Sequence, residues 1–334
     1  MKLTSVAFLY FLLLSILLSV SSQTWFTLWV GMEMSLIFFV PFFLSGSEKT
    51  FKSISVWKYM VVSSVSSAIM FSAFLIYFGW FPFSVVRVSI WVCEFVVLVC
   101  ICVKLGMFPF HEWLMKVGEN SSWAEFASMN TLMKLIPLSV VWFVSMTWEE
   151  EMMIGVSSVI SSLLVSARLT VRRFMVASSL VNMGWAMVFS QHAMDLLVLF
   201  VVFYILGFGT LCLLMSKEGV VKAQDLISSS EKPMGLMKLG KVALFVVVTG
   251  LPPSVVFALK VQMISELCWW EPILALQISS VVLLSFYMLI LYSSIFVAPN
   301  PVKVVAPKWT SCSLMVYFLI SLVFVLGGGL YLLS

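Results

Sequence analysis

Three lysines lie inside long apolar stretches of the sequence, where a cation is costly. They are Lys104, Lys134 and Lys260, and Glu33 has a similar apolar setting in the run Gly31-Met32-Glu33-Met34. An ionisable side chain at the centre of a membrane costs about 3 kcal/mol or more, so each calls for a partner or a function. Removal from water disfavours a charged lysine, and a nearby carboxylate favours it again. A lysine balanced between these effects can take up and release a proton, which is the chemistry we expect here.

Two of these lysines lie beside residues that interrupt a helix. Lys104 is followed by Gly106 and Pro109. Lys260 follows the run Gly250-Leu251-Pro252-Pro253. Proline has no backbone N–H to donate, so we expect each helix to break and resume. In the span count given below, the two segments cross the membrane in opposite directions. Paired broken helices of opposite direction indicate an inverted-repeat transporter with its ion site at the breaks.

The composition requires a membrane protein. Of the 334 residues, 62% are hydrophobic and 10% are charged, whereas soluble domains have about 45–50% and about 25%. So few charges could not cover the surface of a soluble protein of this size. The net charge of +4 gives no case for nucleic-acid binding. The six cysteines lie in apolar runs without a CxxC pair, and only two histidines are present. We therefore expect neither disulfides nor a metal site.

Apolar segments long enough to cross a bilayer recur along the chain. A helix needs about 20 apolar residues to span the hydrocarbon. The sequence therefore predicts an all-α polytopic membrane protein with about eleven transmembrane helices, forming a single domain over residues 1–334. The spans are expected near 4–21, 25–45, 54–80, 88–108, 122–146, 152–167, 173–190, 194–215, 241–267, 273–297 and 310–333.

The positions of lysine and arginine provide an independent check of this count. Basic residues in short loops gather on the non-translocated side of a membrane. Fifteen of the 19 basic residues fall on the side of the N-terminus, Lys52 and Lys116 among them, and Arg87 alone falls on the other side. The remaining three are the intramembrane lysines. This alternation favours eleven spans, with the N-terminus inside and the C-terminus outside.

Plainer interpretations of the charged residues stay open at this stage. Each lysine could extend its ammonium along the apolar stem to the lipid headgroups, and Lys104 most easily, since it lies near the end of its span. Glu94 could pair with Lys104, although ten residues separate them. Glu125 and Glu266 lie near span ends, where we expect them to be solvated. His111 is an interfacial residue or, more weakly, a candidate proton carrier.

Several motifs, in order along the chain, resemble those of the subunit 2 family of mitochondrial NADH–ubiquinone oxidoreductase, or complex I. The run 104–113, followed by Lys134 and Pro137, is similar to the central motif of that family. The glycine–glutamate run around Glu33 resembles its motif in an early span. The serine-rich run 177–180 ahead of Gly184-Trp185 resembles a further motif. Gly250-Leu251-Pro252-Pro253 with Lys260 resembles the last discontinuous helix of the family.

The resemblance implies a proton-translocating subunit with an antiporter-like fold. Glu33 and Lys104 would form an acid–lysine pair, Lys134 would be the central relay, and Lys260 would serve the second broken helix. Proton movement would be driven by quinone reduction elsewhere in the complex. No cofactor is expected on this chain, because NADH, FMN, iron–sulfur clusters and ubiquinone act in the rest of the complex.

The resemblance also implies a place in the cell and a set of partners. The protein would lie in the mitochondrial inner membrane, with its N-terminus on the matrix side and its C-terminus on the intermembrane-space side. Its partners would be the lipid bilayer and other complex I membrane subunits, namely subunits 3, 4, 4L and 6.

Four positions depart from the family pattern. Asn182 stands where the family usually has histidine, which puts a titratable relay there in doubt. Met133 replaces a glutamine, and Val256 and Leu259 replace a glycine and a proline. Two other functions stay open. One is a cation/proton antiporter subunit that works without NADH oxidation and shares the buried lysines. The other is a scaffold whose lysines no longer move protons.

Overall fold

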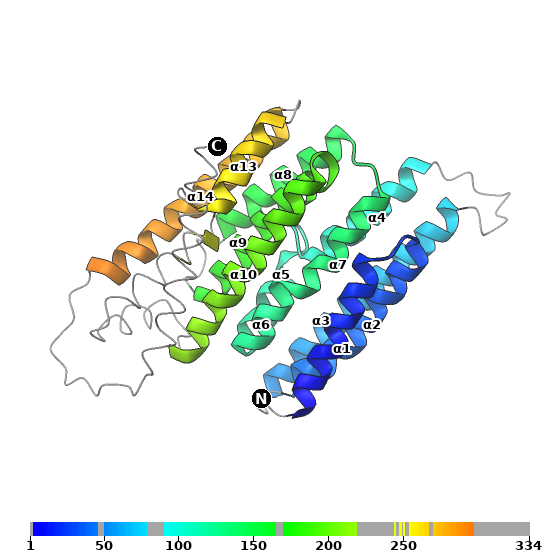
Figure 1. Cartoon of the computed structure of the whole chain (residues 1–334), viewed down its shortest axis with the longest axis horizontal. Coiled ribbons are helices and arrows are strands. Elements are labelled where there is room, and N and C mark those ends of the chain that lie inside the picture. The colour runs from blue at the N-terminus through cyan, green and yellow to red at the C-terminus, as the bar shows by residue number, and fades with distance from the viewer. Residues whose placement is uncertain are drawn as a thin grey trace. The chain divides into compact units, whose positions relative to one another are not determined.

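The described parts of the computed structural model are helical. They comprise residues 3–45, 50–78, 90–164, 170–218, 244, 247–248, 250, 254–266 and 270–296. Within these ranges the elements are α-helices and one 3-10 turn, without a strand (Figure 1). The all-α class that the sequence predicts is confirmed.

The chain divides into two compact units, Met1–Glu151 and Met152–Ser334. The single domain predicted over residues 1–334 stays a prediction. The first unit holds α1 (Leu3–Val20), α2 (Trp25–Leu44), α3 (Thr50–Tyr77), α4 (Ile90–Leu105), α5 (His111–Asn120), α6 (Trp123–Asn130), α7 (Leu132–Val140) and the 3-10 turn η1 (Val141–Phe143). Helix α8 (Trp148–Leu163) begins there and continues into the second unit, which also holds α9 (Val171–His192), α10 (Met194–Glu218), α13 (Val255–Glu266) and α14 (Trp270–Phe296).

Nine of the predicted spans coincide with these helices. Of the span predicted near 241–267, the second half coincides with α13 and most of the first half lies outside the described residues, as does the whole of the last span, near 310–333. The described helical stretches long and apolar enough to cross a membrane are Trp25–Leu44, Lys52–Tyr77, Trp123–Phe143 and Met194–Lys217. Thr4–Val20, Val255–Ser265 and Glu271–Ser285 are shorter apolar stretches. The amphipathic α5 lies between the predicted spans 88–108 and 122–146, and it is the segment in which the fourth helix resumes after its predicted break.

A helix on which a predicted proton-handling site depends packs against at least three others in each unit. In the first unit α7 contacts α1, α2 and α4, and in the second α9 contacts α10, α13 and α14. Every residue of α9 from Phe174 to Ser190 is buried. Ser178 Oγ donates to the Met175 carbonyl at 2.9 Å, so its hydroxyl is satisfied inside the helix. A helix enclosed in this way need not be apolar throughout. This explains why α9 is not among the stretches apolar enough to cross a membrane on hydropathy alone.

The outer helix faces are apolar instead. Leu17 on α1, Val65 on α3 and Leu213 on α10 are each more than half exposed, and other large apolar side chains share these faces. A soluble protein rarely exposes so much contiguous apolar surface. These faces fit a hydrocarbon environment.

Candidate functional site

Helix α4 ends in a glycine-based turn immediately after Lys104. Gly106 has a φ of +76°. Its N–H donates to the Val103 carbonyl at 3.2 Å, and the Met107 N–H donates to the Cys102 carbonyl at 2.9 Å. These two bonds form a Schellman motif, in which the left-handed residue is usually glycine. Helix α5 follows, so the chain breaks and resumes here as the sequence predicts.

Three of the four predicted proton-handling residues line one cavity in the first unit. Glu33, Lys104 and Lys134 all border this space, whose volume is about 40 Å³. A water molecule needs about 10–15 Å³ measured in this way, so the cavity is large enough for water. The other lining residues are Met32, Ser35, Leu36, Tyr59, Val62, Ser63, Ser67, Trp113, Leu114, Met129, Met133, Ile136 and Pro137.

The Lys104 ammonium lies inside the protein rather than among lipid headgroups. Its Nζ is 3.3 Å from the Met32 sulfur, and Glu33 lines the same cavity. Within the described ranges no ion pair of 4.0 Å or less joins Lys104 to Glu33 or to Glu94. Glu33 and Lys104 therefore border the same water-sized cavity without forming a direct ion pair. A water molecule can bridge two polar groups at such a separation.

Lys134 lies just after a second interruption that sequence reasoning missed. The predicted span 122–146 is divided into α6, α7 and η1, and the first two meet at Thr131, with φ −115° and ψ −75°. The Lys134 N–H bonds the Thr131 carbonyl at 3.2 Å, and the residue is 3% exposed. Pro137 was the available signal of irregularity, because it cannot donate to the Met133 carbonyl.

The second unit repeats the glycine turn at Gly250. Its φ is +71°, and its N–H donates to the Val247 carbonyl at 3.1 Å. In a continuous helix the Val248 carbonyl would accept from residue 252, but that residue is Pro252, which has no N–H. The side chain of Asn182 on α9 replaces the missing donor, since its Nδ2 lies 2.8 Å from the Val248 oxygen.

The same asparagine holds Lys260. The Lys260 Nζ donates to Asn182 Oδ1 at 3.0 Å and lies 5.4 Å from the centre of the Trp185 ring. A Cβ on Gly250 would lie 3.1 Å from this Nζ, so glycine lets the ammonium approach the turn closely. Lys260 is 4% exposed and does not reach the lipid. Sequence comparison marked Asn182 as a departure, but the structure shows it to be the partner of the lysine.

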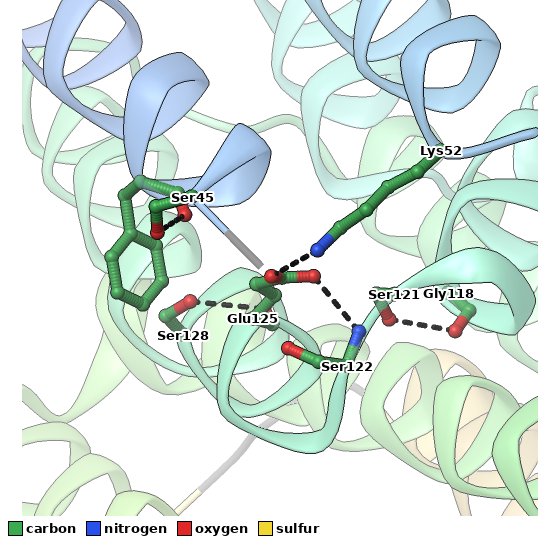
Figure 2. Close-up of polar contacts among 8 residues, drawn as sticks. Ser45, Lys52, Gly118, Ser121, Ser122, Glu125 and Ser128 are labelled. Atoms are coloured by element: carbon green, nitrogen blue, oxygen red, sulfur yellow. Dashed lines mark hydrogen bonds and ion pairs between the residues drawn. The ribbon is translucent and has the colours of Figure 1, made fainter. Parts of the chain in front are cut away.

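One prediction about the acidic residues is wrong, because Glu125 is buried rather than solvated. It is 3% exposed, and its Oε1 lies 2.5 Å from the Lys52 Nζ (Figure 2). Its Oε2 accepts from the Ser122 N–H at 2.8 Å, completing a capping box at the start of α6. The spacing of Ser122 and Glu125 is a readable signal of the cap, but nothing local indicated Lys52. The side chain of Glu266 lies outside the described residues.

Neither His111 nor any described cysteine lines the cavity. His111 opens α5 and stacks on Phe108, with ring centres 5.8 Å apart. Its Nδ1 is buried without a hydrogen-bond partner in the described part of the chain, and it does not line the cavity. The described cysteines are free thiols. Among the described residues no cluster of three or more His, Cys, Asp or Glu side chains could hold a metal ion.

One protein family matches most of the chain. The profile of the NADH:quinone oxidoreductase/Mrp antiporter transmembrane family matches residues 22–286, a range that includes both glycine turns and all four candidate proton-handling residues. The chain belongs to this family. Membership agrees with the antiporter-like fold that the resemblance implied.

Curated relatives with the same name occur in distant animals. NADH-ubiquinone oxidoreductase chain 2 of Ornithorhynchus anatinus is 26% identical over 299 residues, covering 87% of this chain and 85% of the relative. The protein of that name from Artemia franciscana is 27% identical over 299 residues, covering 87% and 90%. These relatives are subunits of an enzyme complex, and their names fit a respiratory-chain membrane subunit.

Solved structures share the fold of the family. Respiratory complex I from Thermus thermophilus with bound aureothin contains a chain that aligns with a TM-score of 0.83 at 17% identity, covering 98% of this chain and 78% of that one. A chain of the Mrp complex from Dietzia aligns with a TM-score of 0.73 at 16% identity, covering 89% and 61%. The chain is thus an integral membrane protein with an antiporter-like, all-α fold, and its homologues place it in the mitochondrial inner membrane.

Proposed function

We propose that this chain is the second subunit of mitochondrial NADH–ubiquinone oxidoreductase and moves protons through the cavity bordered by Glu33, Lys104 and Lys134. The cavity carries the proposal, because an acid and two amines face one water-sized space in the first unit. Its walls otherwise contribute only hydroxyl, indole, thioether and apolar groups. Proton exchange is the chemistry that such a set of groups supports.

Glu33 acts as the electrostatic switch for Lys104. While Glu33 is anionic, it favours the protonated amine; when Glu33 is neutralised or withdrawn, the buried ammonium is no longer compensated and releases its proton. The proton moves to the neutral amine of Lys134, through water in the shared cavity. Since no close ion pair holds Glu33 to Lys104, the carboxylate can alter its influence without first breaking a short contact.

Lys260 serves as the proton-handling lysine of the second unit. Its partner Asn182 is neutral, and an amide oxygen can accept a hydrogen bond from either the charged or the neutral amine. Asn182 therefore keeps the side chain in place through a change of protonation. His111 remains a weaker candidate, because its buried Nδ1 lies beside the first break.

The energy for proton movement comes from quinone reduction in other subunits. This chain holds no redox centre in the proposal, and NADH, FMN, iron–sulfur clusters and ubiquinone act elsewhere in the complex. Its neighbours are membrane subunits 3, 4, 4L and 6. The N-terminus lies in the matrix and the C-terminus in the intermembrane space, as the basic residues indicate. The names of the relatives and the complex I structure that shares the fold support the coarser part of this assignment, a place among the membrane subunits of complex I.

A second function is a subunit of a cation/proton antiporter that works without NADH oxidation. The likeness to the Mrp complex favours it, with a TM-score of 0.73. Native gel electrophoresis of detergent-solubilised membranes, stained for NADH dehydrogenase activity, separates the two. Co-migration with a very large NADH-oxidising band supports the complex I subunit. Migration as a small, stain-negative species would favour the antiporter.

Replacement of Lys134 by methionine tests the proton path. Lys134→Met removes the only amine on α7 while keeping a similar stem, so we expect proton translocation to fall by at least about 100-fold, as for loss of a positioned acid or base. The complex should still assemble. Lys116→Met is the matched control, because Lys116 is exposed and pairs with Glu112 on the surface of α5. Normal proton uptake into vesicles that carry the Lys134→Met complex would contradict the proposal.

A further inference from the structure

Lys52 and Glu125 form a buried ion pair outside the cavity. Their side chains are 7% and 4% exposed, and the Nζ–Oε1 distance is 2.5 Å. The Lys52 Nζ also lies 5.5 Å from the centre of the Phe43 ring. Lys52 belongs to the first turn of α3, Glu125 to the first turn of α6, and Phe43 to the last turn of α2. One small cluster thus joins the ends of three helices, and Figure 2 shows its Lys52–Glu125 pair.

The three helices joined by this cluster also form walls of the cavity. Helix α2 contributes Glu33, α3 contributes Tyr59, and α6 contributes Met129. Tyr59 follows Lys52 by about two helical turns, and Met129 follows Glu125 by about one. The ion pair therefore lies one to two turns from the cavity, at the end where the connecting segments carry the basic residues.

A second polar contact joins the same end of the first unit. Asn120, the last residue of α5, donates from Nδ2 to Ser55 Oγ on α3 at 2.9 Å. Helix α5 supplies Trp113 and Leu114 to the cavity wall. Polar side chains therefore connect α3 to α5 as well as to α6, at the same end of the first unit.

Lys52 and Glu125 differ in how much each charge depends on the other for stabilisation. Glu125 lies at a helix N-terminus, where a carboxylate is favoured by the helix dipole, and it keeps its capping bond to Ser122. Lys52 lies at a helix N-terminus too, where a cation is disfavoured. Without Glu125 the buried ammonium would keep, within the described part of the chain, only the weaker contact with the Phe43 ring. Lys52 therefore depends on Glu125 more than Glu125 depends on Lys52.

We propose that Lys52 and Glu125 are positioning residues for proton transfer, which hold the ends of α2, α3 and α6 together and so set the width of the cavity between Lys104 and Lys134. A buried ion pair contributes little net stability, because the loss of hydration offsets the attraction. Its effect here is geometric. A displacement of about 1 Å can slow a positioned reaction by up to about 100-fold. The inference rests on the proposed function of the cavity.

The test uses the intact complex in vesicles. Glu125→Gln removes the charge but leaves an amide that can complete the capping box. Lys52→Met with Glu125→Gln removes both charges, so no unpaired ion remains buried to prevent folding. We expect the double variant to assemble, as judged on native gels, and to move protons about tenfold more slowly per assembled complex, because the tie between the helices is gone. The single Glu125→Gln variant should assemble less well than the double.

An exposed ion pair serves as the control, and Lys134→Met distinguishes failure of this inference from failure of the proposed function. Lys116→Met with Glu112→Gln removes an ion pair from the same side, but its side chains are 53% and 69% exposed, so proton movement should not change. If the double variant at Lys52 and Glu125 moves protons as fast as the parent, the pair is only structural and the inference is overturned. If Lys134→Met also moves protons normally, the proposed function itself is wrong.

Discussion

The glycines at 106 and 250 share a positive φ and one backbone hydrogen bond, but the lysines beside them have different partners. Each glycine has a φ between +70° and +80°, and each donates its N–H to the carbonyl three residues earlier. At the first turn Lys104 borders a cavity together with an acid. At the second turn Lys260 donates to the amide of Asn182 and lies over an indole ring.

The difference shows that one backbone device can support two kinds of lysine site. A carboxylate can change its charge, so it can change the proton affinity of the lysine that it faces. An amide cannot change its charge, so it fixes the position of its lysine without switching it. In the proposed mechanism, Lys104 is therefore controlled electrostatically, whereas Lys260 is held geometrically.

The largest expected effect is at the acid of the first site. Glu33→Gln removes the charge that favours protonated Lys104, so we expect proton translocation per assembled complex to fall by about 100-fold. Dye-monitored acidification of vesicles during NADH oxidation measures it. Glu94→Gln is the matched control, since Glu94 lies on α4 and does not line the cavity. If Glu33→Gln and Glu94→Gln reduce proton translocation equally, Lys104 is not controlled by Glu33, and the contrast drawn with Lys260 is wrong.

A smaller effect is expected at the amide of the second site. Asn182→Leu leaves both the Val248 carbonyl and the Lys260 ammonium without their asparagine contact, which costs about 1–3 kcal/mol for each buried group. The thermal midpoint of the complex should fall, and proton translocation should fall about tenfold. Asn182→His keeps a hydrogen-bonding group and should lose less of both. If Asn182→Leu matches the parent in both measurements, Asn182 does not hold Lys260.

The smallest effects are expected at the glycines, and they should differ in kind. Alanine at either position is strained by about 1–2 kcal/mol, because φ is positive. An added Cβ would lie 2.9 Å from the Leu114 side chain at Gly106, but 3.1 Å from the Lys260 Nζ at Gly250. Both variants should lower the thermal midpoint, and Gly250→Ala should slow proton movement by a few-fold and more than Gly106→Ala, because its added Cβ meets the lysine amine itself. If Gly106→Ala slows proton movement more than Gly250→Ala does, the expected difference between the two glycine positions is wrong.

The candidate site was largely readable from the sequence because charges in apolar segments stand out. Lys104, Lys134 and Lys260 were selected on that basis, and the glycine and proline residues predicted the breaks beside two of them. The structure places Lys104 and Lys134 on one cavity with Glu33. The interruption at Thr131 was missed, since threonine is compatible with a continuous helix. The burial of Glu125 was missed because its partner belongs to another helix.

The sequence by itself determined the class of protein, and it predicts the spans and the side on which the basic residues gather. Hydropathy and charge act locally, because each segment is sorted between water and lipid by its own residues. Only the tertiary structure decided which polar groups meet. Lys52 finds Glu125 across 73 residues and Lys260 finds Asn182 across 78. Contacts of that range depend on how the helices pack, and helix packing depends on the shapes of many side chains at once.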